Sequence, residues 1–153
     1  MMEPQRSVSG GGRVGIFRSI LVGYDGSKES RRALLVADAL ALALDGEVHV
    51  LQVIRIPAHS ETSEELEVAQ RAEGLTLSQG LADTWDPTRH KQQVGLHVVF
   101  GDDPAKAIAD FVRDHGIDVV VVGGHGRDQS VHRGIGHSLE SLLRRHSCPV
   151  LVV

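Results

Sequence analysis

Short runs of β-branched and other apolar residues alternate along the chain with segments whose apolar residues recur at helical spacing. One helical segment follows each of the first four runs, as parallel strands joined by crossover helices require. We therefore expect an α/β fold with a single open, parallel five-stranded sheet and helices on both faces. The predicted strands are 20–22, 48–54, 94–100, 119–122 and 149–153, and the predicted helices are 28–44, 65–81, 104–115 and 139–146.

The ends of the predicted helices carry residues that commonly cap helices. Ser27 is the expected N-cap of the first helix, and Gly46 lies just past its end. Asp103 is expected to cap the third helix, with Pro104 at its first position and Gly116 at its end.

Two segments depart from this pattern. Residues 1–15 are polar and glycine-rich and are predicted to form a disordered tail, so that the folded domain covers 16–153. Residues 57–64 are predicted to form a polar loop before the second helix, whose amphipathic pattern Gly74 and Gly80 interrupt.

The sequence carries no sign of export or of a membrane span. The first 15 residues contain no apolar stretch that could serve as the core of a signal peptide, and the single cysteine, Cys148, cannot form an internal disulfide. The longest apolar runs, 39–44 and 119–122, are far shorter than the roughly 20 residues that cross a bilayer. We therefore expect a cytoplasmic protein without membrane contact.

Charge and aromatic content argue against a nucleic-acid partner. The 153 residues include 16 Lys and Arg against 20 Asp and Glu, which gives a net charge of −4 and no excess of positive charge for phosphates. Aromatic residues make up only 3% of the chain, too few to build a stacking platform for single-stranded bases.

A glycine-rich segment follows the strand 119–122 and precedes the last helix. Five of the 17 glycines lie between Gly123 and Gly136. Without Cβ atoms, this main chain can bring its N–H groups close to a phosphate, and the start of the next helix adds its positive dipole end. A turn shaped by glycines, without any ligand, would explain the same composition.

The common nucleotide-binding motifs are absent. The chain has no G-x-x-x-x-G-K-[ST] sequence, and no G-x-G-x-x-G follows the first strand. The second strand ends in Val53, Ile54 and Arg55, without the acidic residue that would hold the ribose of a dinucleotide. A P-loop and a dinucleotide-binding Rossmann site are therefore excluded.

Four motifs, spread over residues 17–153, together resemble the universal stress protein family. They are VGYDGS at 22–27, GDDPA at 101–105, the pair Gly123 and Gly126 followed nine residues later by Gly136, and the ending CPVLVV. The resemblance implies an adenine nucleotide alpha hydrolase-like sheet with strand order 3-2-1-4-5 and a homodimer formed through the last strand, 150–153. In one subgroup of the family it also implies ATP bound between strands 1 and 4.

The resemblance also implies a set of binding residues. Asp25, with Gly23 and Tyr24 before it, would face the ribose, and Val53 and Val122 would contact the adenine. The residues implied around the phosphates are Gly123, Gly126, Arg127, Gly136, His137 and Ser138. The expected ligand is ATP, with ADP or AMP as alternatives and Mg²⁺ as a companion of the nucleotide.

His137 leaves two hypotheses open. In the ATP-binding subgroup the residue after the last glycine is Ser or Thr, whereas this chain has His137 there and Ser138 one place later; Ser130 replaces an apolar residue. The imidazole either donates a hydrogen bond to a phosphate or blocks the site. In the second case the protein would be a dimeric, stress-associated interaction module that binds no nucleotide, with a protein partner that the sequence does not identify.

Other candidate chemistry has simpler explanations. His125, His132 and His137 match no common zinc-binding spacing, so no metal site is expected. Cys148 is expected to be a small buried thiol, and Asp25 could serve only as a turn and cap residue. No catalytic constellation emerges, so we expect at most slow ATP hydrolysis and no dedicated enzyme.

Overall fold

The computed structural model describes residues 16–56, 62–82, 85–90, 94–124, 137–145 and 148–153, with the side chains of residues 137 and 138 outside the description. The predicted tail, residues 1–15, lies outside the described residues. In chain order the elements are β1 (Ser19–Gly23), α1 (Lys28–Leu44), β2 (Glu47–Ile54), α2 (Ser63–Ala82), the short 3₁₀ helix η1 (Pro87–Arg89), β3 (Val94–Phe100), α3 (Pro104–His115), β4 (Val119–Val122), α4 (His137–Arg145) and β5 (Val150–Val152).

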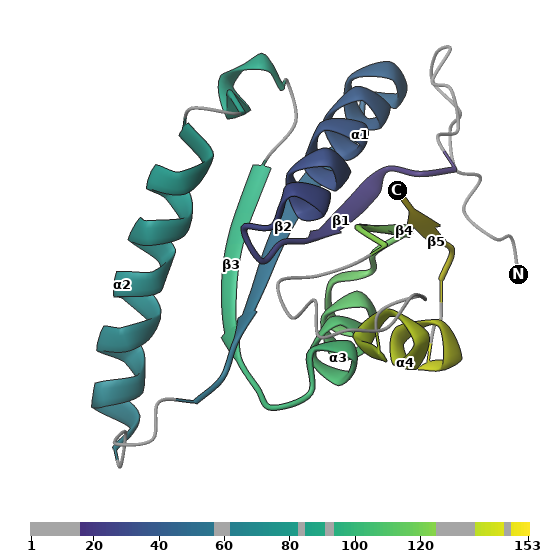
Figure 1. Ribbon diagram of the computed structural model, residues 1–153. Coiled ribbons are helices and arrows are strands. Elements are labelled where there is room, and N and C mark those ends of the chain that lie inside the picture. Colours follow the sequence, from purple (N-terminus) through teal and green to yellow (C-terminus); the bar gives the residue numbers. More distant parts are fainter. Residues whose placement is uncertain (1–15, 57–61, 83–84, 91–93, 125–136, 146–147) are drawn as a thin grey trace, which may run out of the picture.

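The five strands form one parallel sheet in the order β3-β2-β1-β4-β5 (Figure 1). β1 lies in the centre, with Val22 opposite Val50 of β2 on one side and Val121 of β4 on the other. The predicted α/β class, the parallel strands and the order 3-2-1-4-5 are confirmed.

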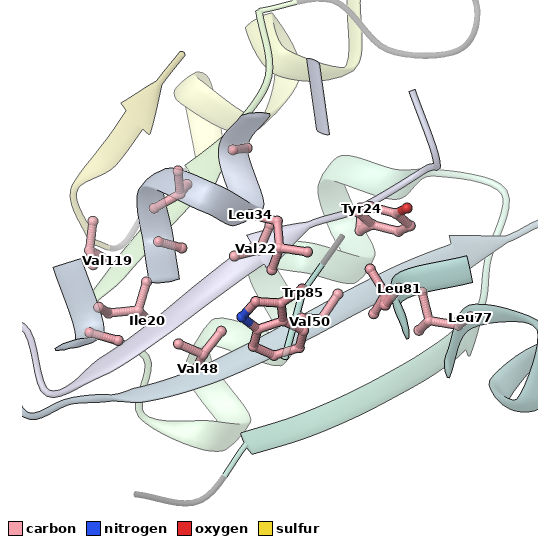
Figure 2. Packing of buried hydrophobic residues seen from close by; sticks show 14 of the residues in the cluster. Ile20, Val22, Tyr24, Leu34, Val48, Val50, Leu77, Leu81, Trp85 and Val119 are labelled. Atoms are coloured by element: carbon pink, nitrogen blue, oxygen red, sulfur yellow. The ribbon is translucent and has the colours of Figure 1, made fainter. Parts of the chain in front are cut away.

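The strands bury side chains on both faces, and each face has its own core. On one face α1 and α2 cover Ile20, Val22, Val48 and Val50, together with Trp85 (Figure 2). On the other face α3 and α4 cover Leu21, Leu51, Val120 and Val122. Burial of each aliphatic side chain favours folding by about 1.5–3 kcal/mol, which explains why β4 consists of four valines.

The helix caps explain where the helices begin and end. Ser27 Oγ accepts a hydrogen bond from Ser30 N at 3.1 Å, and Asp103 Oδ1 accepts one from Lys106 N at 3.2 Å, so both predicted N-caps are confirmed. Gly116 ends α3 with a φ of 62°, a conformation that glycine adopts without strain. α1 ends at Leu44 with Asp45 as its C-cap, which adopts a φ of 55°.

Gly46 lies just past the end of α1, as predicted, and its N–H donates to Ala41 O at 2.9 Å; it also meets a packing requirement. A Cβ at this position would lie 3.0 Å from the carbonyl oxygen of Arg18, so the glycine allows the chain entering β2 to pass close to the start of β1.

The predicted C-terminal boundary of the loop 57–64 is wrong by two residues, because α2 already begins at Ser63. Thr62 and Glu65 form a reciprocal capping box: Glu65 N donates to Thr62 Oγ1 at 3.2 Å, and Thr62 N donates to a Glu65 carboxylate oxygen at 3.1 Å. The Thr-x-x-Glu signal was present in the sequence and places the helix start two residues earlier than the apolar periodicity does. None of the described helices is long and apolar enough to cross a membrane.

Candidate functional site

The candidate site lies at the carboxyl ends of β1 and β4, where the direction of the connections changes. The chain leaves β1 toward α1 on one face of the sheet, and α4, which follows β4, packs on the opposite face. Ligands of open parallel sheets bind at such a switch point, because the diverging connections leave a crevice there.

The turn after β1 holds Asp25 at this edge. Its Oδ1 accepts a hydrogen bond from Ser27 N at 2.9 Å, and Gly26 adopts a φ of 79°, which favours glycine. Ser27 then caps α1. Asp25 therefore has the turn role that its sequence context indicates, and its predicted contact with a ribose stays a prediction.

Tyr24 points into the core. Its side chain is only 7% exposed and lies in the same cluster as Leu77 and Leu81 of α2 (Figure 2). Its main-chain N–H donates to Leu51 O at 2.9 Å. The ring stabilises the face that α1 and α2 cover, so a ligand contact through Tyr24 stays a prediction.

Aliphatic side chains form an apolar floor at the switch point, on the face that α3 and α4 cover. Val122, 8% exposed, belongs to that core, and half-buried Val53 packs against it. Gly23 lies on the strand between them: a Cβ there would be 3.2 Å from Val122 Cγ1 and 3.6 Å from Ile108 Cδ1. Because Gly23 has no side chain, Val122 and Ile108 can pack close to the main chain of β1 at this point.

Gly123 has a packing role that requires no ligand. A Cβ at this position would lie 2.5 Å from Glu29 Cβ and 2.9 Å from the Glu29 carbonyl carbon, so the first turn of α1 lies directly against the glycine. The next residue, Gly124, donates its N–H to Val153 O at 3.0 Å, and Val153 N donates to Val122 O at 3.0 Å. Helix α1 and the end of β5 therefore hold the entry of the glycine-rich segment.

Three of the six predicted phosphate-binding residues lie outside the described residues. This applies to Gly126, Arg127 and Gly136, and equally to His125, Ser130 and His132. α4 begins at His137, so the predicted helix after the glycine-rich segment is confirmed. The contacts of His137 and Ser138 with phosphates stay predictions.

The described residues hold no group of three or more His, Cys, Asp or Glu side chains arranged to bind a metal ion. Cys148 is half-buried rather than fully buried, because it precedes the edge strand β5. Burial, assisted by the nearby Asp118 carboxylate, raises the pKa of its thiol. Cys148 is therefore a protonated, weakly nucleophilic thiol at neutral pH.

The sequence pattern does not predict two polar clusters that the structure contains. Asp38, Trp85 and His90 form a buried hydrogen-bonded group, and His49 and His97 face each other across neighbouring strands. Each joins residues more than 45 positions apart, and only the register of the strands and the path of the α2–β3 connection bring them together. The one sequence feature that could have indicated these clusters is a polar residue at a position whose neighbours in the pattern face the core.

The model of the universal stress protein family matches residues 16–153. The chain belongs to this family. A universal stress protein of Methanocaldococcus jannaschii, MJ0531, is 26% identical over 147 residues, which cover 90% of this chain and 82% of the relative. YxiE, a universal stress protein of Bacillus subtilis, is 25% identical over 150 residues, which cover 90% of this chain and 99% of the relative.

Solved structures show the same fold at lower sequence identity. The protein MJ0577 superposes with a TM-score of 0.74 at 24% identity, with 90% of this chain and 96% of that chain covered. A universal stress protein in complex with cAMP superposes with a TM-score of 0.60 at 22% identity, with 90% of this chain and 96% of that chain covered. A universal stress protein of Archaeoglobus fulgidus in complex with dAMP superposes with a TM-score of 0.61 at 19% identity, with 90% of this chain and 98% of that chain covered.

Proposed function

We propose that this universal stress protein binds an adenine nucleotide, ATP first among them, at the switch point between β1 and β4. The observation that carries the proposal is the apolar floor of Val53 and Val122, where Gly23 lets Val122 pack close to the main chain of β1, bordered by the turn that holds Asp25. Two structural relatives have been solved with the adenine nucleotides cAMP and dAMP.

The residues present suit each part of such a ligand. Half-buried Val53 and the mostly buried Val122 would give an adenine aliphatic contacts, and no stacking aromatic ring is needed for it. Asp25 is a hydrogen-bond acceptor for ribose hydroxyls. Main-chain N–H groups of the glycine-rich segment, the N-terminus of α4 and Arg127 would receive the phosphates, and Mg²⁺ would supply further positive charge to them.

The nucleotide acts as a regulatory ligand in this proposal. The protein works as a dimer in a stress response, and the nucleotide-bound state differs from the free state in what the dimer contacts. Hydrolysis of ATP is slow and incidental, because no motif of the sequence sets a general base beside the phosphates.

A pair of glycine substitutions tests the apolar floor. Gly23→Ala places a methyl group on the floor, 3.2 Å from Val122 Cγ1, and should weaken ATP binding about tenfold in titration calorimetry, equivalent to about 1.4 kcal/mol. Gly124→Ala is the matched control: its Cβ would meet Val152 and Val153 at 3.8 Å, an ordinary contact. Equal affinity of the wild type and Gly23→Ala for ATP would refute the floor assignment.

The second candidate function, a dimeric interaction module without a nucleotide, follows from the residue that begins α4. His137 stands at the helix end where a phosphate would bind. His137→Ser separates the two functions: a loss of ATP affinity supports the imidazole as a phosphate ligand, and a gain supports the blocked site. Titrations of ATP, ADP and AMP, with and without Mg²⁺, then identify the preferred ligand.

We further propose that two copies associate through β5. This strand forms an edge of the sheet, and its Leu151 and Val152 are 37% and 41% exposed. An exposed apolar edge strand invites pairing with a second strand, and a homodimer would cover it.

A further inference from the structure

Three histidines from three elements meet on the face of the sheet that α3 covers. His49 of β2 and His97 of β3 place Nδ1 and Nε2 3.1 Å apart, and the ring of His115, at the end of α3, lies 5.8 Å from that of His97. Phe111 joins the group: its ring stacks on His115 at 3.8 Å and meets His97 edge-on at 4.7 Å. These four rings connect the C-terminal half of α3 to both strands.

The contact between His49 and His97 requires one proton between the two nitrogens. Glu47 Oε2 lies 3.7 Å from His49 Nε2 and favours a proton there, so we assign His49 Nδ1 as the acceptor and His97 Nε2–H as the donor. A first added proton puts a charge among half-buried aromatic rings. A second added proton leaves an N–H group on both His49 Nδ1 and His97 Nε2, so the two nitrogens face each other as donors and the hydrogen bond between them is lost.

Few neighbouring groups compensate such a charge. Glu47 lies beside His49 on β2, and a groove between β3 and α3 is lined by Asp103, Lys106, Asp110, Asp114 and His115. The three groove carboxylates already pair with basic side chains: Asp110 with Lys106 at 2.8 Å, Asp114 with Arg113 at 3.2 Å and Asp103 with Arg145 at 3.5 Å.

The neutral forms of His97 and His49 are favoured at neutral pH. Burial, followed by the neighbouring His49 and His115, lowers the pKa of His97 to about 4. Burial also lowers the pKa of His49, although Glu47 acts in the opposite direction.

We propose that His49 and His97, with Phe111 and His115 of α3 packed against them, form an acid-sensitive latch: the neutral His49–His97 pair holds α3 against β2 and β3, and protonation of the pair releases the helix. The same helix carries Ile108, which packs against the apolar floor: its Cδ1 would lie 3.6 Å from a Cβ added at Gly23, and it shares a core with Val122. Release of α3 therefore lowers the affinity for the adenine nucleotide, a step that rests on the proposed function.

The direction of the pH effect follows from the lowered pKa. Below pH 6.5 the unfolded chain binds a proton at His97 that the folded protein does not, so stability falls as the pH drops and the change is complete near pH 4. At pH 5.0 we expect His97 alone to raise the unfolding constant about tenfold, after allowance for the solvent screening of a half-buried group.

Hydrogen exchange of the peptides from α3, residues 104–115, tests the latch in the full chain without any nucleotide. Between pH 7.5 and pH 5.0, after correction for intrinsic exchange, the wild type should lose about tenfold in protection there. His97→Gln, whose amide can still donate to His49 Nδ1 but does not titrate, should lose less than threefold. Equal losses in the two proteins, or no loss in the wild type, would overturn the proposal.

Two further variants secure the comparison. His49→Gln removes the other titrating partner and replaces His97→Gln if the latter does not fold. His59→Gln, at a position outside the described residues, controls for the loss of one histidine and should behave as the wild type does. If His59→Gln retained the protection of α3 at pH 5.0 as His97→Gln does, the loss of any histidine would have this effect, and the role proposed for the His49–His97 cluster would be contradicted.

Binding of ATP at the two pH values tests the link to the site. The wild type should bind ATP about tenfold more weakly at pH 5.0 than at pH 7.5, and His97→Gln should show a smaller change. Absence of binding at pH 7.5 would refute the proposed function alone, since the exchange experiment requires no nucleotide. Release of α3 with unchanged ATP affinity would overturn the link between latch and site.

Discussion

The indole Nε1 of Trp85 donates a hydrogen bond to the carboxylate of Asp38 across 2.7 Å. Asp38 is only 5% exposed, and the same oxygen, Oδ1, also contacts Nε2 of His90 at 2.5 Å. Arg89 approaches the other oxygen at 3.7 Å. Because Asp38 lies on α1 and its partners surround η1, this group fixes the connection between α2 and β3 to the first helix.

Asp38→Ala should destabilise the protein by about 2–4 kcal/mol, because it leaves a buried indole N–H and a buried imidazole without their acceptor. Urea unfolding at pH 7.5, followed by Trp85 fluorescence, measures the change in the free energy of unfolding. Asp114→Asn, which weakens an exposed ion pair with Arg113, should change it by less than about 0.5 kcal/mol. Similar losses in the two variants would contradict a structural role for the buried group.

The proposed dimer predicts a clear effect of a charge on β5. Leu151→Glu introduces a carboxylate at an exposed position of the edge strand, where burial against a second copy would be costly. We expect light scattering on a sizing column to report a dimer for the wild type and a monomer for this variant, with unchanged circular dichroism. Leu35→Glu, at an exposed position of α1, is the control and should remain dimeric. A wild type that is monomeric at all concentrations would contradict the dimer.

Cys148 should react slowly with alkylating reagents. Burial and the Asp118 carboxylate raise the pKa of its thiol, so the thiolate fraction at pH 7.5 is smaller than that of an exposed cysteine. Iodoacetamide labelling followed by mass spectrometry should be slower in the folded protein than in urea, and the rate should rise with pH without a plateau below pH 9. Faster labelling in the folded state would contradict the assignment.

The sequence predicted the fold almost completely but only the framework of the site. Alternating apolar runs are a local signal, and they suffice for β1, β4 and the helices between the strands. The capping residues Ser27 and Asp103 are equally local. The clusters around Asp38 and His97 depend on strand register and on the path of a connection, which no local pattern encodes.

Gly123, in the candidate site, is a further example of a residue whose contacts a local sequence pattern does not predict. The family resemblance implies a phosphate contact for it, which stays a prediction, and its neighbour in the structure is Glu29. The contact between a residue of α1 and one beyond β4 arises from the strand order, so the packing reason for this glycine becomes visible only in three dimensions.

The two explanations of Gly123 predict different results for Gly123→Ala. The added Cβ would lie 2.5 Å from Glu29 Cβ and 2.9 Å from its carbonyl carbon, so either α1 or the end of β4 must shift. We expect a loss of about 1–3 kcal/mol in the free energy of unfolding without any nucleotide, as for other overpacked positions. Gly124→Ala, whose Cβ would make only ordinary contacts at 3.8 Å, should change stability by less than about 0.5 kcal/mol. A Gly123→Ala protein as stable as the wild type, but with weaker ATP binding, would instead assign this glycine to the phosphates alone.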